Sequence, residues 1–173
     1  KIRWEMDKKF TNEDIDYHLE QFKRTELNVF FLMLTGYITE TKQDHLDTLK
    51  MFKRWQHYVA TGTITGIDFG KTLLILPGTP LYDMIEKENI NFLPSMNNDT
   101  EMGKLNSFWT SENNPELTIP ERIRRRLEIQ EVAIKYNWPI WRGAERLNAV
   151  KHLAIQYNTQ KHTRTSAIPL IFK

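Results

Sequence analysis

The sequence predicts an α/β fold with parallel strands, followed by a helical C-terminal region. Residues 28–35 form an apolar run of strand length, residues 41–58 have helical spacing, and residues 70–76 form a second apolar run. A strand, a helix and a strand joined by short turns make a βαβ crossover, which connects parallel strands. Ligands in such sheets bind at the carboxyl ends of the strands, which here are residues 34–37 and 76–79.

The composition is typical of a single globular domain. Of 173 residues, 40% are hydrophobic and 27% are charged, and the formal net charge of +2 is too small to indicate nucleic acid binding by itself. No apolar run approaches the roughly 18 residues of a membrane helix, and the N-terminus does not resemble a signal peptide, so we expect a cytoplasmic protein with no membrane partner. Because the chain begins at Lys1 in the middle of an apparent element, we expect a fragment or a processed form.

The sequence contains no cysteine. This excludes disulfides, thiolate catalysis and cysteine-ligated zinc or iron–sulfur sites within this chain. The five histidines show no metal-ligand spacing: His18, His45, His57, His152 and His162. We therefore expect these histidines at ordinary surface or core-edge positions and no metal ligand in this chain.

Two helices with similar starts are predicted around the first strand. The first begins after Thr11, with Asp14 at the third helical position as in a capping box, and the second begins after Thr41, with Asp44 in the same place. The first helix ends near residue 25. The apolar stripes expected to face the sheet are Ile15, Leu19 and Phe22 in the first helix and Leu46, Leu49 and Phe52 in the second, with Trp55 close by.

The segments on either side of the second predicted strand are less regular. Residues 60–68 are rich in glycine and threonine and fit either a loop or the start of a ragged strand. Beyond residue 76, Thr79 and Pro80 predict the start of a short helix that ends near Asn89, because proline is tolerated at the first helical position.

A change of composition divides the chain. Residues 90–116 are dominated by Asn, Ser, Asp, Pro and Gly, and a connection of this length is typically a functional lid or a mobile linker. We therefore divide the chain into a βα segment at 1–90, an irregular linker or lid at 91–117 and a helical region at 118–173.

The helical region contains two predicted helices separated by an aromatic turn. Thr118 opens the first helix with a capping box to Glu121, and the helix is expected to run to about Tyr136. Its expected buried stripe is Ile119, Ile123, Leu127 and Ile134. The aromatic turn spans residues 138–141, the last helix about 143–157, and a polar tail follows.

Three motifs, in order and at similar spacing, resemble those of the radical S-adenosylmethionine (SAM) enzymes. Residues 36–41, Gly-Tyr-Ile-Thr-Glu-Thr, resemble their Gly-x-Pro-Gly-Glu-Thr turn, and residues 76–82, Leu-Pro-Gly-Thr-Pro-Leu-Tyr, resemble their Pro-Gly-Thr-x-Leu turn. Residues 2–8 resemble the segment that follows the fourth barrel strand. This resemblance covers roughly residues 1–90, and residues 118–141 are similar to the C-terminal region of members that also bind cobalamin (B12).

The resemblance implies a partial (βα)6 barrel, also called a partial TIM barrel, whose last two strands this chain supplies. It implies that Lys8 contacts the carboxylate of SAM, a role suited to an ammonium point charge. It also implies that the main chain from Leu34 to Gly36 lies beside the adenine, where glycine lets the backbone approach a ligand closely. Glu40 is expected to brace the next helix. The implied cofactors are SAM, an iron–sulfur cluster and, in the members just named, cobalamin, whose use stays open.

The sequence departs from this family where the reactive chemistry resides. The family holds its cluster with Cys-x3-Cys-x2-Cys, and this chain has no cysteine. Leu32 stands where some members place a ribose-binding polar residue, and Ile38 and Thr39 replace the usual Pro and Gly. By itself the chain is expected not to cleave SAM, and the resemblance implies a missing N-terminal half of the same protein as a partner.

Simpler interpretations of the same residues are open. Lys8 fits a solvated surface lysine, and Gly36 and Gly78 fit ordinary turn glycines. Asp68 fits a substrate-facing polar residue, although its spacing does not require that role.

A cluster of arginines and a group of aromatic residues also allow two interpretations. Four arginines in five helical positions cannot share one face, and acidic neighbours offset them, so we expect a solvated, ion-paired helix: Arg122, Arg124, Arg125 and Arg126. A phosphate or RNA contact is the alternative. For Tyr136, Trp138 and Trp141 we prefer a plug at the end of an open barrel to a platform for stacking bases.

These observations favour the C-terminal portion of a radical SAM enzyme that helps to bind SAM and an unidentified small-molecule or tRNA substrate. The predicted lid would cover the substrate. The alternative is a non-catalytic α/β binding or scaffold module, and a third hypothesis is an RNA-binding piece that uses the arginine helix.

Overall fold

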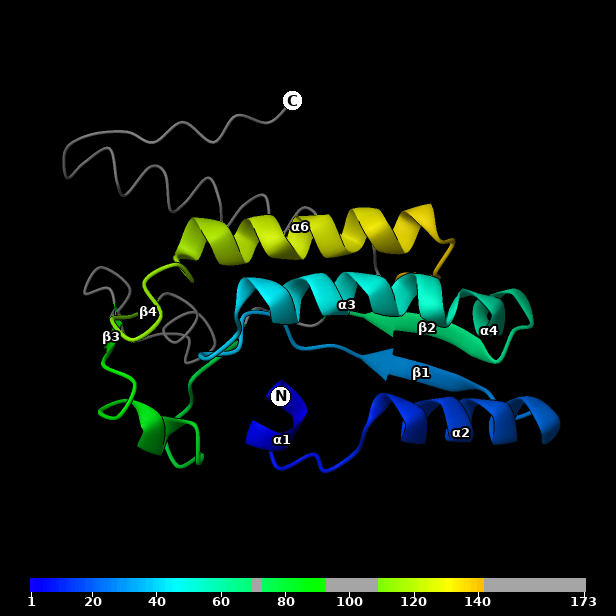
Figure 1. The fold of residues 1–173 in the computed structure, drawn as a ribbon, viewed down its shortest axis with the longest axis horizontal. Coiled ribbons are helices and arrows are strands. Elements are labelled where there is room, and N and C mark those ends of the chain that lie inside the picture. The colour runs from blue at the N-terminus through cyan, green and yellow to red at the C-terminus, as the bar shows by residue number, and fades with distance from the viewer. Residues whose placement is uncertain (70–72, 93–108, 142–173) are drawn as a thin grey trace.

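The computed structural model describes residues 1–69, 73–92 and 109–141, which Figure 1 shows in colour. The predicted last helix, the polar tail and most of the predicted lid lie outside the described residues. The described elements are, in chain order, α1 (Ile2–Glu5), α2 (Asn12–Arg24), β1 (Val29–Leu32), α3 (Lys42–Arg54), α4 (Gln56–Ala60), β2 (Ile64–Asp68), the 3-10 turn η1 (Tyr82–Met84), β3 (Ile90–Phe92), β4 (Trp109–Ser111) and α6 (Ile119–Lys135).

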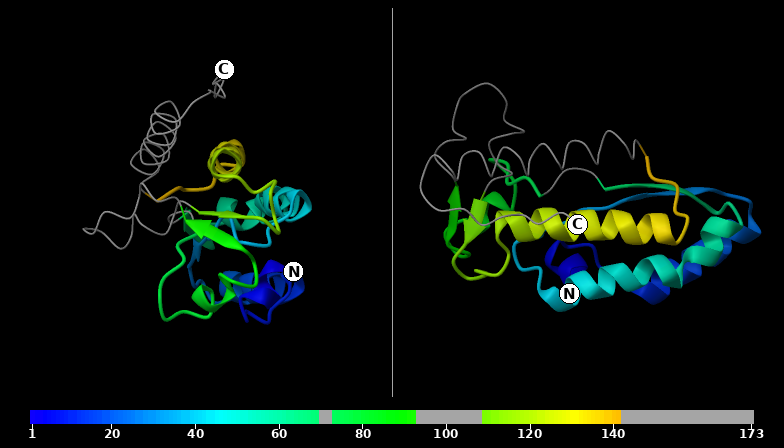
Figure 2. Two further views of the ribbon diagram at one scale, coloured as in Figure 1. Left: turned by 90° about the vertical axis from the view of Figure 1, so that its left-hand side faces the viewer. Right: turned by 90° about the horizontal axis from the view of Figure 1, so that it is seen from above.

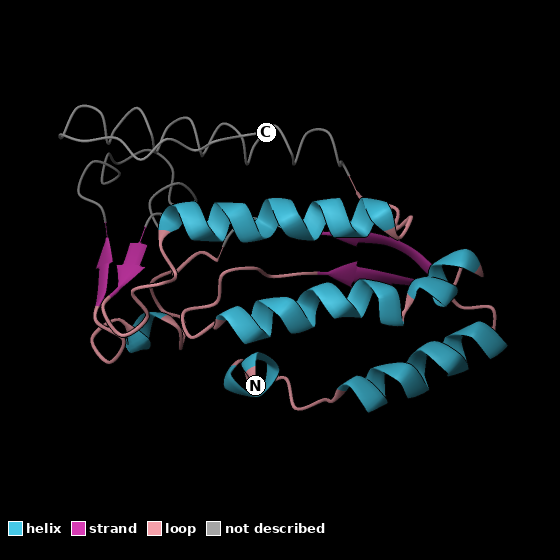
Figure 3. Cartoon of the chain, turned by 45° about the horizontal axis from the view of Figure 1, so that its top comes forward, coloured by secondary structure: helices cyan, strands magenta, loops and turns pink. Residues whose placement is uncertain are grey.

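The strands β1 and β2 form a two-stranded parallel sheet, with Val29 opposite Ile64 and Leu32 opposite Asp68. Because α3 and α4 connect the two strands, the predicted βαβ crossover and the α/β class with parallel strands are confirmed. Figure 3 shows these two strands side by side. The described residues do not form a barrel, so the six-stranded barrel stays a prediction.

The position of the second strand was predicted wrongly. The strand is β2 at Ile64–Asp68, whereas residues 73–76 have no strand structure. Ile64 and Ile67 are buried in the core. Gly66 lies under the ring of Phe30, where an added Cβ would be only 2.7 Å from the ring. Glycine normally weakens a strand, but here close packing against Phe30 requires it. The carboxyl end of the second strand is therefore Asp68 rather than Leu76.

The strand β1 is buried on one face only, whereas its continuous apolar run is typical of a strand buried on both faces and had predicted that. Val29 and Phe31 pack against the core, whereas Phe30 and Leu32 lie on the other face and Leu32 is 82% exposed. Side chains alternate between the two faces of a strand, so helices on one side leave the other side open. The right-hand view of Figure 2 shows α3 and α6 on the same side of the strands.

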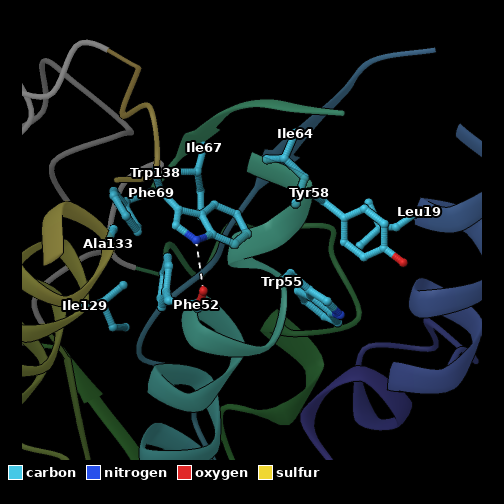
Figure 4. Packing of buried hydrophobic residues seen from close by; sticks show 10 residues of the cluster. All are labelled: Leu19, Phe52, Trp55, Tyr58, Ile64, Ile67, Phe69, Ile129, Ala133 and Trp138. Carbon is cyan, nitrogen blue, oxygen red and sulfur yellow. Dashed lines mark hydrogen bonds between the residues drawn. The ribbon is translucent and has the colours of Figure 1, made fainter. Parts of the chain in front are cut away.

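Figure 4 shows the main core, in which the indole of Trp138 lies between α3 and the sheet. Its Nε1–H donates a hydrogen bond to the carbonyl oxygen of Phe52 at 3.0 Å, and its ring meets those of Phe31 and Phe52 edge-on. Burial of Trp138 removes it from any stacking platform, whereas Trp141 is 54% exposed. The ten buried residues are Leu19, Phe52, Trp55, Tyr58, Ile64, Ile67, Phe69, Ile129, Ala133 and Trp138.

The segment after α6 pairs with the free edge of β2. The Ile67 N–H donates to the Pro139 carbonyl at 2.8 Å, and the Trp141 N–H donates to the Ile67 carbonyl at 2.9 Å. Ile140 thereby makes a parallel bridge with Ile67. The aromatic turn therefore covers an edge of the sheet that would otherwise expose unpaired backbone groups.

The two capping boxes around β1 are confirmed. The hydroxyl of Thr11 accepts from the Asp14 N–H while the Asp14 carboxylate accepts from the Thr11 N–H, and Thr41 and Asp44 form the same pair of bonds. The third predicted box is only half formed. Thr118 accepts from the N–H of Glu121, but the Glu121 carboxylate binds two arginines instead.

Three helix predictions need correction. The helix expected at 41–58 breaks at Trp55 into α3 and α4, and the helix expected at 80–89 is only the short turn η1. Leu46 and Ile134, both expected to be buried, are 38% and 62% exposed. The helix α6 itself was predicted correctly, but its buried face was assigned to partly different residues from those that are buried.

The ends of the predicted linker form regular structure. β3 and β4 pair antiparallel, with Ile90 opposite Ser111 and Phe92 opposite Trp109. Residues 93–108 lie outside the described part of the chain, and the proposed division into three segments stays a prediction. No helix among the described residues is long and apolar enough to cross a membrane.

Candidate functional site

The turn after β1 is held by its own glutamate. Gly36 has a φ of +74°, a conformation that glycine adopts without a Cβ penalty. The Gly36 N–H donates to Glu40 Oε2 at 2.8 Å, which closes the turn. Tyr37 and Ile38, between them, are buried. The carboxyl end of β1 is therefore followed by a rigid turn.

All three segments that carry the family resemblance meet in one hydrophobic cluster around this turn. Tyr37 and Ile38 come from the turn, Leu73 and Ile75 from the segment before the Pro-Gly-Thr turn, and Met6 packs against them from the N-terminal segment. Leu81, beyond the Pro-Gly-Thr turn, also packs on this cluster. Segments about 40 residues apart in sequence are thus brought together at one end of the parallel strands.

Polar contacts tie α1 and the segment after β2 to the same turn. Lys1 Nζ donates to the Thr39 carbonyl at 2.8 Å, and the Thr39 hydroxyl donates to the Glu5 carboxylate. The Leu73 N–H donates to the Thr35 carbonyl at 3.2 Å, which brings the chain beyond β2 alongside the end of β1.

A buried arginine fills the open side of Gly36. A Cβ added at Gly36 would lie 2.9 Å from Cδ of Arg122. The Arg122 guanidinium lies 3.9 Å from the centre of the Trp109 ring and donates from Nη2 to the Trp109 carbonyl at 2.6 Å. The absence of a side chain at Gly36 therefore allows Arg122 of α6 to pack closely against the turn.

Glu40 joins the turn to α6, which gives it a bracing role on a different helix from the one expected. Its Oε1 accepts from Arg125 Nη1 at 3.0 Å, and Arg125 Nε donates to Glu121 Oε1 at 2.8 Å. Glu121 also accepts two bonds from Arg124, and these arginine contacts lower the pKa of Glu121 to about 2. The second ion pair of Arg124 is with Glu128.

The expectation of a solvated arginine helix is wrong. Arg122, Arg125 and Arg126 are each at most 3% exposed, and only Arg124 has the predicted exposed, ion-paired environment. The turn after β1 supplies carbonyl and carboxylate acceptors to Arg125, and Trp109 supplies an aromatic face to Arg122. These partners allow the two charged side chains to be buried. This burial removes most of the cluster on which the RNA-binding hypothesis depended.

Of the three predicted SAM-binding residues, two lie together and one lies on another segment. Leu34 and Gly36 follow β1; Leu34 is 39% exposed and Gly36 is buried. Lys8 is exposed, and its N–H donates to the Arg3 carbonyl at 2.7 Å. The Lys8 ammonium forms no hydrogen bond or ion pair with another residue in the described ranges, so its charge is available to a ligand.

The described residues leave exposed positions that could contact SAM but offer no ligands for an iron–sulfur cluster. The Gly36 N–H bonds to Glu40 and its open side is filled by Arg122, so of the three predicted residues Leu34 and Lys8 are the two with exposed surface. An iron–sulfur cluster does not fit, because the chain has no cysteine and the described residues contain no group of three or more His, Cys, Asp or Glu side chains arranged to hold a metal ion.

Sequence reasoning anticipated neither the burial of Arg122 nor its contact with Trp109, the two features that most shape this site. The available signal was the spacing of Arg122, Arg126 and Gln130 at every fourth position, which places them on one helix face. That face proves to be the buried one. Comparison of the chain with protein-family models, with curated proteins and with solved structures gave no match.

Proposed function

We propose that this chain is the C-terminal portion of a radical SAM enzyme, in which residues 1–90 help to bind SAM and substrate. In this proposal β1 and β2 are the last two strands of a partial (βα)6 barrel. The iron–sulfur cluster would be held by cysteines outside this sequence, and no reaction step is assigned to this chain.

The observation that carries the proposal is the single cluster shared by the three family-like segments. Residues 2–8, 36–41 and 76–82 resemble the family in order and spacing, and side chains from or next to all three pack together at the end of β1. The shared location adds to the shared motif order as support for a common role. The carboxyl ends of parallel strands are also where α/β sheets bind ligands.

Each predicted residue has a limited role in this proposal. The exposed Lys8 ammonium pairs with the SAM carboxylate, and the half-exposed Leu34 side chain offers apolar surface to the adenine. Gly36 acts through the turn, because its N–H is bonded to Glu40 and its open side is filled by Arg122. No described contact supports the use of cobalamin.

Isothermal titration of the whole chain with SAM and with decarboxylated SAM tests the assignment of Lys8. A solvent-exposed ion pair contributes roughly 0.2–1 kcal/mol, so removal of the ligand carboxylate should weaken binding by up to about fivefold. In Lys8→Ala the two ligands should bind equally. Lys9→Ala is the matched control, because Lys9 is also exposed but pairs with Asp7 at 2.9 Å.

Two results would reject the proposal in different ways. Absence of SAM binding would leave the chain as a non-catalytic α/β binding or scaffold module. Equal loss of discrimination in Lys8→Ala and Lys9→Ala would retain SAM binding but remove the specific role of Lys8.

A further inference from the structure

The buried face of α6 is polar at its centre. Arg122, Arg126 and Gln130 follow one another at every fourth position and are each at most 3% exposed. Both side-chain atoms of the Gln130 amide are buried without a hydrogen-bond partner. Helix faces that pack against a core are normally apolar, so this face has donors and acceptors beyond what packing requires.

Arg122 is the charged member of this face with two side-chain nitrogens that have no hydrogen-bond partner within the described ranges. Its Nη2 donates to the Trp109 carbonyl, but Nε and Nη1 are buried and have no acceptor among the described residues. The carboxylate whose charge favours the ionised form of Arg122 is Glu40, and both Glu40 oxygens already accept bonds from Gly36 and Arg125. Among the residues that the structure describes, Arg122 is therefore a buried cation without an ion-pair partner of its own.

The electrostatic state of Arg122 agrees with this description. Burial lowers the pKa of Arg122 to about 9, and Glu40 only partly opposes that shift. The guanidinium still carries its charge near neutral pH. An uncompensated buried charge is strongly unfavourable, and the contact with the Trp109 ring offsets only part of that penalty.

A second buried polar group without a partner among the described residues belongs to the residue before Gly36. The Thr35 hydroxyl is buried and makes no hydrogen bond in the described part of the chain. Thr35 directly precedes Gly36, whose open side faces the Arg122 stem. The Thr35 hydroxyl and the Arg122 guanidinium thus belong to two segments that meet at Gly36, at the carboxyl end of β1, where ligands of α/β folds bind.

We propose that Arg122 Nε and Nη1, together with the Thr35 hydroxyl, bind an oxyanion at the carboxyl end of β1. The oxyanion is the phosphate or carboxylate group of a small ligand, because a guanidinium forms strong charge-assisted bonds with both groups. The site does not involve Lys8 and does not depend on SAM binding.

Thermal unfolding of the whole chain in phosphate, acetate or chloride at matched ionic strength and pH tests the site. At a hundred times its dissociation constant, a bound anion should raise the midpoint by roughly 5–10 °C for a chain of this length. Equilibrium dialysis with labelled phosphate or acetate should show binding to the wild-type chain. A response to phosphate alone identifies a phosphate-bearing ligand, and a response to acetate alone identifies a carboxylate.

Arg122→Met is the decisive variant, and Arg124→Met is its control on the same helix. Methionine keeps much of the arginine stem without the charge, and loss of a buried unpaired charge need not unfold the chain. Anion binding should disappear in Arg122→Met and persist in Arg124→Met, since Arg124 is 52% exposed and paired. Thr35→Val, which removes only the hydroxyl, should weaken binding severalfold.

The proposal is overturned if neither phosphate nor acetate binds the wild-type chain. It is also overturned if phosphate stabilises Arg122→Met as much as wild type, because a general salting effect would then account for the shift. Loss of SAM binding with retained anion binding, or the reverse, separates this site from the proposed cofactor site.

Discussion

Replacing Gly36 by alanine should destabilise the chain more than the same replacement at Gly62. Both glycines have positive φ angles, +74° and +78°, so alanine suffers the same left-handed backbone penalty of about 1–2 kcal/mol at either site. The surroundings differ. An added Cβ at Gly36 would lie 2.9 Å from Arg122 Cδ, whereas nothing lies within 4 Å of a Cβ at Gly62.

The difference between the two variants isolates the steric contact. Arg122 cannot easily move, because its guanidinium is held by the Trp109 ring and carbonyl. Overpacking of a filled core typically costs about 1–3 kcal/mol, so Gly36→Ala should lose that much more free energy of unfolding than Gly62→Ala. For a chain of this size the extra loss corresponds to about 2–4 °C per kcal/mol in the thermal midpoint.

Urea denaturation followed by circular dichroism measures both free energies of unfolding. Equal losses in Gly36→Ala and Gly62→Ala would refute the close contact between the turn and α6. The double variant Gly36→Ala with Arg122→Ala supplies a further check, because removing the arginine stem should abolish the steric part of the loss.

Three further outcomes are expected from the local contacts. Thr41→Ala should lose about 1 kcal/mol of unfolding free energy in urea titration, because it removes the N-cap of α3. Trp138→Phe should lose about 1–3 kcal/mol or more, since it leaves the Phe52 carbonyl unpaired in the core, and a loss below 0.5 kcal/mol would contradict that bond. The pKa of Glu121 is lowered to about 2, so its stabilising effect is complete above its ordinary value near 4.5 and is lost as pH falls toward 2. Urea midpoints of wild type and Glu121→Gln should therefore converge between pH 4.5 and 2, and a constant difference across that range would contradict the arginine contacts.

Features set by neighbouring residues in sequence were predicted well. The capping boxes at Thr11 and Thr41 depend on residues three positions apart, and both form as expected. The crossover between parallel strands was also correct, because the order of strand, helix and strand leaves few alternatives.

Features set by distant partners were predicted poorly. Gly66 argues against a strand until the Phe30 ring is known to lie over it, and that contact joins strands 36 positions apart. Burial of Arg122 and Arg125 depends on acceptors at Trp109 and Glu40, which no local pattern reveals. The sequence therefore predicted a candidate site at the end of the first strand, which stays a prediction, but not the burial of the arginines against that turn.

The pairing of residues 139–141 with β2 has a consequence for synthesis of the chain. One edge of β2 pairs with β1. On the other edge, the hydrogen-bond partners of Ile67 are Pro139 and Trp141, which are translated more than 70 residues later. At about 5–20 residues per second, translation of that interval takes roughly 4–15 s. During those seconds a nascent chain on a polysome exposes an unpaired strand edge to its neighbours, a surface suited to capture by a chaperone.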